Sequence, residues 1–169
     1  MQRSDSPSSR PKALYTPEQR ARRDASVWTL VQGILAPVQF LAFIVSAVLV
    51  MRFLMTGEGY VLATVSILIK TALLYAIMVT GAIWEKVVFG QYLLAPAFFW
   101  EDVVSFGVIA LHTLYLWGLL TGSIAPYPLM LITLAAYAIY CVNALQFLLK
   151  LRAARLDAAA DALPRGVSA

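Results

Sequence analysis

The stretch WEKVVFGQYLLAPAFFWED, residues 84–102, decides the fold because it is a polar break between two long apolar runs. It places Glu85, Lys86, Glu101 and Asp102 directly beside segments long enough to cross a membrane. Two apolar runs joined by such a break predict a helical hairpin with the break at one membrane surface. Carboxyl groups are costly near hydrocarbon and usually serve function there, so we expect any chemistry at this break.

The composition predicts an all-α integral membrane protein. Of the 169 residues, 61% are hydrophobic and only 13% are charged, whereas about a quarter of a soluble domain is charged. Four apolar runs are each long enough to span ~30 Å of hydrocarbon. They are predicted at about Trp28–Leu54, Tyr60–Ile83, Asp102–Leu120 and Pro128–Leu149. Pro37 lies inside the first run and should kink that helix.

Outside the spans, the sequence is polar and basic. Thr16 can cap a short helix that starts at Pro17, and Gln19 can close a capping box. The predicted organisation is a disordered basic tail (1–14), an interfacial helix (15–27), a four-helix transmembrane domain (28–149) and a basic cytoplasmic tail (150–169).

Lysine and arginine are distributed unevenly between the two sides of the predicted bundle. Eleven of the 13 lie near the chain ends or in the 84–101 connection, whereas Arg52 is alone on the other side and Lys70 lies within the second span. Because positive residues favour the cytoplasmic side, both termini and the connection are predicted to be cytoplasmic. The basic groups flank apolar spans, so we expect an anionic lipid membrane as a partner and no nucleic acid.

The third predicted span carries a polar stripe. Glu101, Ser105 and His112 fall within about 40° of one another on a helical wheel, and Asp102 lies about a quarter turn away. The stripe runs from the cytoplasmic interface to the middle of the membrane. His112 either makes one hydrogen bond to a neighbouring helix or serves function, as intramembrane ionisable groups often do.

The acids at the break can meet, because Glu85 ends the second predicted span while Glu101 and Asp102 begin the third. A carboxyl group that keeps its proton near neutral pH can act as a general acid, and an ionised neighbour can act as the base. Glu85 and Glu101 are the first pair to test, with Asp102 next. In the structural alternative, Glu85 pairs with Lys86 and Asp102 helps to cap the third helix.

Other polar and aromatic side chains gather toward the same side. Amides in the first and fourth spans either hydrogen-bond between helices or line a pocket open to the cytoplasm: Gln32, Gln39, Asn143 and Gln146. The aromatic side chains fit either an interfacial belt or a platform for a large flat ligand: Trp28, Trp84, Phe89, Tyr92, Phe98, Phe99 and Trp100. Lys70, in mid-span, is expected mainly to snorkel toward the surface.

Three stretches of the chain resemble a known family. They are LYTPEQRARRDASVWTLVQGILAPVQF (14–40), KTALLYAIMVTGAIWEKVVFGQYLLAPAFFWEDVVS (70–105) and NALQFLLKLRAARLD (143–157). They resemble the 3-vinyl (2-vinyl) bacteriochlorophyllide hydratase family of bacteriochlorophyll biosynthesis. The resemblance covers nearly all of residues 14–157, and its most specific motifs are GAIWEKVVFG and APAFFWEDVVS.

The resemblance implies a hydro-lyase. Water would add across the 3-vinyl group of chlorophyllide a, or of a related magnesium tetrapyrrole, to give a 3-(1-hydroxyethyl) group. The resemblance implies no cofactor, and it implies a multi-pass location in the bacterial inner membrane, cytoplasmic or intracytoplasmic and photosynthetic. Other bacteriochlorophyll-synthesis enzymes are candidate partners. It carries over no catalytic residues.

This chemistry needs an acid, a base, a positioned water and a flat apolar slot. The candidate catalytic residues are Glu85, Glu101, Asp102 and His112, with His112 as a proton relay or a ligand of the substrate magnesium. The candidate substrate-binding residues are Trp84, Lys86, Phe98, Phe99, Trp100, Gln39 and Asn143, in which Lys86 would meet the substrate propionate and ring faces favour a nearby cation. We expect no metal site of the protein's own.

Two other classes of function stay open on the sequence. A non-catalytic pigment-binding or assembly protein would use the same pocket, with His112 on the magnesium and the acids as structural groups. A small transporter would use Lys70 and the acids as a relay. Hydration by the purified protein would distinguish an enzyme from the first class, and flux in liposomes would support the second.

Overall fold

The computed structural model describes residues 14–162, with side chains up to residue 156. Within this range the chain is entirely helical apart from short connections, so the predicted all-α fold is confirmed. The helices are α1 (Pro17–Ala25), α2 (Val27–Thr56), α3 (Tyr60–Phe89), α4 (Phe99–Thr121) and α5 (Pro126–Ala162). The predicted disorder of the first residues and the end of the predicted basic tail fall at 1–13 and 163–169, outside the described residues.

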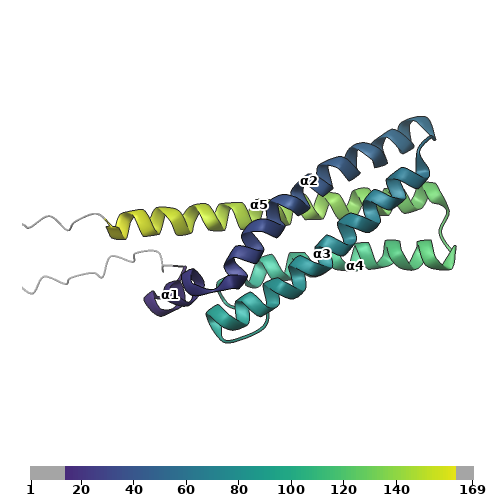
Figure 1. Ribbon diagram of the computed structural model, residues 1–169. Coiled ribbons are helices and arrows are strands. Elements are labelled where there is room, and N and C mark those ends of the chain that lie inside the picture. The colour runs from purple at the N-terminus through teal and green to yellow at the C-terminus, as the bar shows by residue number, and fades with distance from the viewer. Residues whose placement is uncertain (1–13, 163–169) are drawn as a thin grey trace, which may run out of the picture.

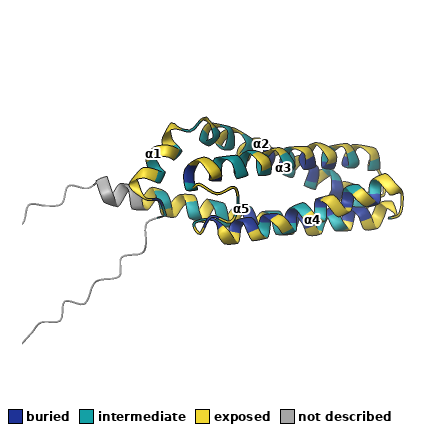
Figure 2. Ribbon diagram, turned by 90° about the horizontal axis from the view of Figure 1, so that it is seen from below, coloured by how far each residue is buried: buried dark blue, intermediate teal, exposed yellow. Residues whose placement is uncertain are grey.

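Four of these helices are long and apolar enough to cross a membrane, by length and composition. They form two antiparallel hairpins, α2–α3 and α4–α5, whose turns lie at the same end of the molecule (Figure 1). Seen from below, the two hairpins run alongside each other, and α1 lies at the opposite end from these turns (Figure 2). The four predicted spans therefore correspond to four helices of spanning length.

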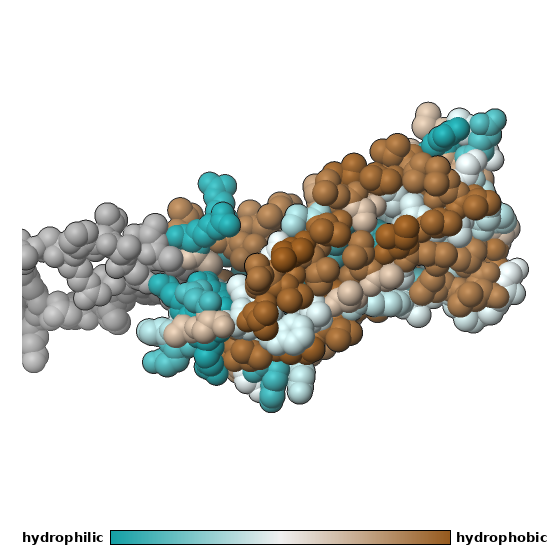
Figure 3. Space-filling model, viewed as in Figure 1, coloured by the Kyte–Doolittle hydropathy of each residue, from teal (hydrophilic) through white to brown (hydrophobic). Residues whose placement is uncertain are grey.

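The surface of the bundle matches a membrane environment. Figure 3 shows hydrophobic side chains over the middle of one face, with hydrophilic groups at α1 and at the α2–α3 turn. Large apolar side chains on several helices are exposed, among them Val48 and Val79, which are 64% and 62% exposed. Such a contiguous apolar surface would be unfavourable in water, and lipid is the solvent that it suits.

The α3–α4 connection is shorter than predicted. The predicted connection spans residues 84–101, but α3 continues to Phe89 and α4 begins at Phe99. Apolar Val87–Phe89 extend the helix until Gly90, whose φ of 88° ends it in a left-handed cap. Glu85 and Lys86 are therefore helical, and the connecting loop comprises only residues 90–98.

The helix ends follow the predicted local rules. The capping box of α1 is present: Thr16 N–H donates to Gln19 Oε1 at 2.9 Å, and Gln19 N–H donates to Thr16 Oγ1 at 3.2 Å. α2 continues through Pro37, and its ribbon bends along its course (Figure 1). α5 runs without a break to Ala162. The basic tail predicted from residue 150 therefore begins as part of this helix.

Candidate active site

A pair of carboxyl groups lies where the connecting loop 90–98 joins α3 to α4. The side chains of Glu85 and Asp102 lie close enough to interact as a pair, and they are only 5% and 4% exposed. An ionised carboxylate only accepts hydrogen bonds, so a direct hydrogen bond between these two groups would require a proton on one of them. The carboxyl pair, Glu85 and Asp102, therefore brings together two buried groups of the kind that acid–base chemistry uses.

Two consecutive backbone amides of the connecting loop hold this pair. Leu94 N–H donates to Asp102 Oδ2 at 2.7 Å, and Ala95 N–H donates to Glu85 Oε2 at 3.1 Å. Leu94 has a φ of 59°, in the left-handed region that a branched side chain seldom adopts. Backbone strain of this kind persists where the surroundings over-determine it, often at functional sites. Here it accompanies two adjacent donors directed at the two carboxyl groups.

The third acid has a different partner. Glu101 Oε1 and Oε2 each lie 3.0 Å from Lys150 Nζ of α5, and Lys150 also donates to the Ala97 carbonyl of the loop. The acids do meet at one end of the bundle, but the structure joins Glu85 to Asp102 and Glu101 to Lys150. Lys86, which the structural alternative paired with Glu85, is exposed and donates to Gly90 O at 2.8 Å.

Sequence reasoning missed Lys150 because it was assigned to a basic tail. The available signal was helical spacing: Asn143, Gln146 and Lys150 lie at i, i+3 and i+7 and share one face of a helix that continues beyond the predicted span. Asn143 Nδ2 donates to Ser105 Oγ of α4 at 2.5 Å. This face of α5 is therefore the one that packs against the polar stripe of α4.

The aromatic side chains divide between two environments. Phe98 is buried in a cluster with ring centroids 5.6 Å from Trp84 and 5.8 Å from Phe89. Phe99 and Trp100 are 41% and 67% exposed. Successive helical residues point about 100° apart, so the predicted three-residue platform cannot present a single face. Trp84 also donates from Nε1 to Thr29 Oγ1 of α2 at 2.9 Å.

Tyr15 anchors α1 to this aromatic cluster. Its ring stacks on Phe89 at a centroid distance of 5.8 Å, and the Arg23 guanidinium lies 4.8 Å from the Tyr15 ring centroid. Burial raises the pKa of the Tyr15 hydroxyl, and the positive charge of Arg23 opposes that rise. The aromatic cluster therefore connects α1 with the ends of α3 and α4 beside the carboxyl pair.

A second group of buried polar side chains lies far from the loop. In this central cluster, Lys70 is fully buried with Nζ 4.0 Å from the Tyr140 ring centroid and 5.5 Å from that of Tyr137. The expectation that Lys70 snorkels is therefore wrong, because the ammonium group packs against aromatic ring faces instead. The His112 ring centroid lies 5.9 Å from that of Tyr137, whose hydroxyl donates to Ser46 Oγ at 2.6 Å.

His112 lies on the buried face predicted for the stripe of Glu101 and Ser105. Its Nδ1 is 2.8 Å from the Val108 carbonyl oxygen. A carbonyl only accepts, so Nδ1 carries the proton and Nε2 of the neutral ring keeps its lone pair. In the described part of the chain, His112 Nε2, Lys70 Nζ and Gln39 Nε2 have no hydrogen-bond partner.

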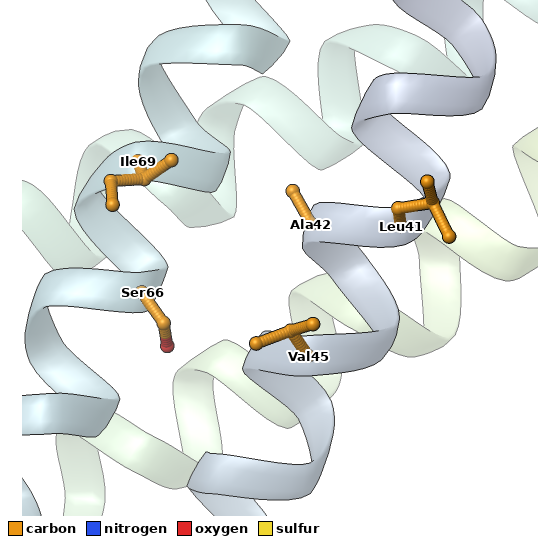
Figure 4. Close-up of a pocket in the computed structure, with 5 residues that line it drawn as sticks. All are labelled: Leu41, Ala42, Val45, Ser66 and Ile69. Atoms are coloured by element: carbon orange, nitrogen blue, oxygen red, sulfur yellow. The ribbon is translucent and has the colours of Figure 1, made fainter.

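A pocket between α2 and α3 holds no chemical groups of this kind. It has a volume of about 220 Å³ and is lined by Leu41, Ala42, Val45, Ser66 and Ile69 (Figure 4). Small-molecule sites usually measure about 300–1,000 Å³, and this lining has no titratable side chain. Over residues 14–156, no three His, Cys, Asp or Glu side chains are grouped so that they could hold a metal ion.

Four helices of spanning length and a buried pair of carboxyl groups at one end of them are the features of a multi-pass membrane protein with ionisable groups near the membrane surface. Residues 15–153 match the family described as 2-vinyl bacteriochlorophyllide hydratase (BCHF), so the chain belongs to that family and the predicted resemblance is confirmed. No solved structure matches the chain.

Two relatives carry that name. The 2-vinyl bacteriochlorophyllide hydratase of Rhodobacter capsulatus is 75% identical over 150 residues, which cover 89% of this chain and 87% of the relative. The protein of the same name from Cereibacter sphaeroides is 71% identical over 153 residues, which cover 90% of this chain and 94% of the relative.

Proposed function

We propose that this chain is a hydratase that adds water to the vinyl group of a bacteriochlorophyll precursor, with chlorophyllide a as the first substrate to test. Family membership and the names of both relatives support the reaction class. The observation that carries the proposal is the carboxyl pair, since hydration of an alkene needs one group that gives a proton and one that takes a proton.

The reaction divides into three proton movements. Glu85 gives its proton to the terminal vinyl carbon, whose π electrons form the new C–H bond, and the inner carbon becomes a cation delocalised into the macrocycle. Water then bonds to the inner carbon through its oxygen, and Asp102 takes the excess proton. Transfer of this proton from Asp102 to Glu85 restores the starting state. The net change is one water added and a 1-hydroxyethyl group formed.

The positions of the two groups at helix ends support this division of roles. Asp102 lies in the first turn of α4, where the positive end of the helix dipole favours a carboxylate. Glu85 lies near the C-terminal end of α3, where the negative end of the dipole favours the neutral form. Glu85 is therefore the acid and Asp102 the base, and both keep the loop amide that holds them.

The substrate must reach groups that are almost fully buried. The vinyl group is small, so the macrocycle can stay outside the bundle while the loop or an adjacent side chain moves to admit it. Trp84 and Phe98 supply ring faces beside the carboxyl pair, and ring faces favour a developing cation. Lys86 is exposed near Tyr92, with Nζ 5.2 Å from the ring centroid, and can meet the substrate propionate at the surface.

The proposed orientation places both termini and the connecting loop in the cytoplasm, in the inner membrane of a bacterium. The excess of lysine and arginine at that end supports it. Reporter fusions at Ala169 and at Gly57 should report opposite sides of the membrane. Fusions that report the same side would contradict the four-span topology.

The decisive experiment is to incubate the purified protein, in detergent or nanodiscs, with chlorophyllide a. The expected product has the mass of the substrate plus one water molecule, and it should be absent with the Glu85→Gln protein. Stoichiometric pigment binding without hydration would contradict the enzyme. It would instead support a pigment-binding protein, a function that the unpartnered Nε2 of buried His112 favours.

A further inference from the structure

Lys150 connects three parts of the site although it touches neither member of the carboxyl pair. Its ammonium group bridges the Glu101 carboxylate, 49 positions away in the chain, and the Ala97 carbonyl, 53 positions away. It also lies 5.4 Å from the Phe98 ring centroid. Glu101 is almost buried, with 7% of its side chain exposed, and Lys150 exposes 27%. The Lys150 ammonium group is therefore largely buried, and its contacts with Glu101, Ala97 and Phe98 fix its position.

These contacts reach the amides that hold the carboxyl pair. Phe98 N–H donates to the Ala95 carbonyl at 2.8 Å, so residues 95–98 form one turn. Lys150 holds that turn at Ala97. The turn begins at Ala95, whose N–H faces Glu85, and directly follows Leu94, whose N–H faces Asp102. Residues 90–98 are not held by helical backbone hydrogen bonds. A contact from α5 to Ala97 therefore restricts the movement of the neighbouring Leu94 and Ala95 amides.

We propose that Lys150 is a positioning residue, which anchors the connecting loop to α5 and thereby keeps the Leu94 and Ala95 amides on the carboxyl pair. This inference rests on the proposed function for its effect on turnover, but not for its effect on the loop. A lipid-facing role does not account for the contacts of Lys150, since its ammonium group points inward to Ala97 and Glu101. Arg152, which is exposed on the same helix, suits a lipid phosphate better.

The test compares Lys150→Met, Lys150→Arg and the matched control Arg152→Met in the full-length protein. In Lys150→Met, amide hydrogen exchange at residues 90–98 should rise by about tenfold or more, because local opening controls exchange. Turnover should fall about 10–100-fold with little change in KM, as when a catalytic group is displaced by about 1 Å. Lys150→Arg, which keeps the charge, should recover most of the protection and turnover, and Arg152→Met should match the wild type.

The outcomes separate this inference from the proposed function. Wild-type protein that does not hydrate the pigment contradicts the proposed function, while the exchange measurement still decides on the anchor. Unchanged exchange at residues 90–98 in Lys150→Met overturns the anchor. A fall in thermal stability with turnover per folded molecule unchanged shows a purely structural ion pair and overturns the positioning role. Should Lys150→Met not fold, Lys150→Gln replaces it, because the shorter, uncharged side chain loses the ion pair with Glu101 and the same rise in exchange at residues 90–98 is expected.

Discussion

The loop end of the bundle and its middle both bury ionisable side chains, and they satisfy them in different ways. At the loop end, the carboxyl pair, Glu101 and Lys150 contact each other or loop backbone within hydrogen-bond distance. In the middle, Lys70 rests on tyrosine rings and has no hydrogen-bond acceptor among the described residues. The loop end therefore joins ionisable groups to hydrogen-bond partners, whereas the middle holds a charge against ring faces.

The two regions also differ in their backbone. The carboxyl pair is held partly by an irregular loop with a left-handed leucine, and the central cluster lies wholly on regular helices. Irregular backbone beside a membrane segment needs its own hydrogen-bond partners. In this chain the two carboxyl groups provide them, so the side chains that could carry the chemistry also keep the loop folded.

The largest expected effect is the loss of the acid. Glu85→Gln keeps an oxygen for the Ala95 amide and places an N–H toward Asp102, so the protein should fold. It cannot give a proton, and turnover should fall by ~10²–10⁴-fold. Asp102→Asn should lose activity to a similar extent, because it removes the base. Assays of folded, purified protein with chlorophyllide a would measure both.

Glu58→Gln is the matched control for these two variants, because Glu58 is an exposed acid in the turn between α2 and α3, away from the connecting loop. It should hydrate the pigment at the wild-type rate. Near-normal turnover in Glu85→Gln would remove Glu85 from the mechanism. Normal turnover in Asp102→Asn with loss in Glu101→Gln would restore the pairing that the sequence placed first.

A smaller effect is expected at His112. His112 is buried against Tyr137, and its one hydrogen bond is to Val108 of its own helix, so its bracing role would rest on packing. His112→Ala should therefore lower stability by ~1–3 kcal/mol, as the truncation of a buried side chain usually does. Turnover per folded molecule should stay unchanged. Thermal unfolding together with binding of chlorophyllide and of its magnesium-free form would measure this. Selective loss of affinity for the magnesium pigment would support a ligand role, and loss of turnover with both affinities intact would support a relay.

The smallest effect is expected at Lys70. Contact with ring faces is worth up to ~2 kcal/mol when the cation is desolvated, but burying the charge costs several kcal/mol. These terms oppose each other, so Lys70→Met should unfold at about the same temperature as the wild type or at a higher one, with normal turnover. A large loss of turnover in Lys70→Met would contradict the view that only the loop end takes part in the chemistry. It would support a proton path through the middle of the bundle.

Local patterns predicted much of this protein because they depend on neighbours in the chain. Apolar length predicted four spans, the Thr16–Gln19 spacing predicted the capping box, and the spacing of Glu101, Ser105 and His112 predicted one buried face. Predictions failed where the outcome depended on a distant partner. Lys70 was expected at the surface, but two tyrosines from α5 surround it, and nothing near Lys70 in the chain indicates them.

The sequence by itself therefore determined the membrane class, the short connection that brings the acids to one end of the bundle, and the family, since motifs and hydrophobic length are properties of contiguous residues. The helices pair as α2–α3 and α4–α5, whereas the sequence predicted a hairpin of α3 with α4. Tertiary structure decided which acid meets which partner. Glu101 and Asp102 are adjacent and chemically alike, and their directions differ by about 100° around α4. Only the docking of α3 on one side and α5 on the other directs Asp102 to Glu85 and Glu101 to Lys150, and that docking depends on packing across the whole bundle.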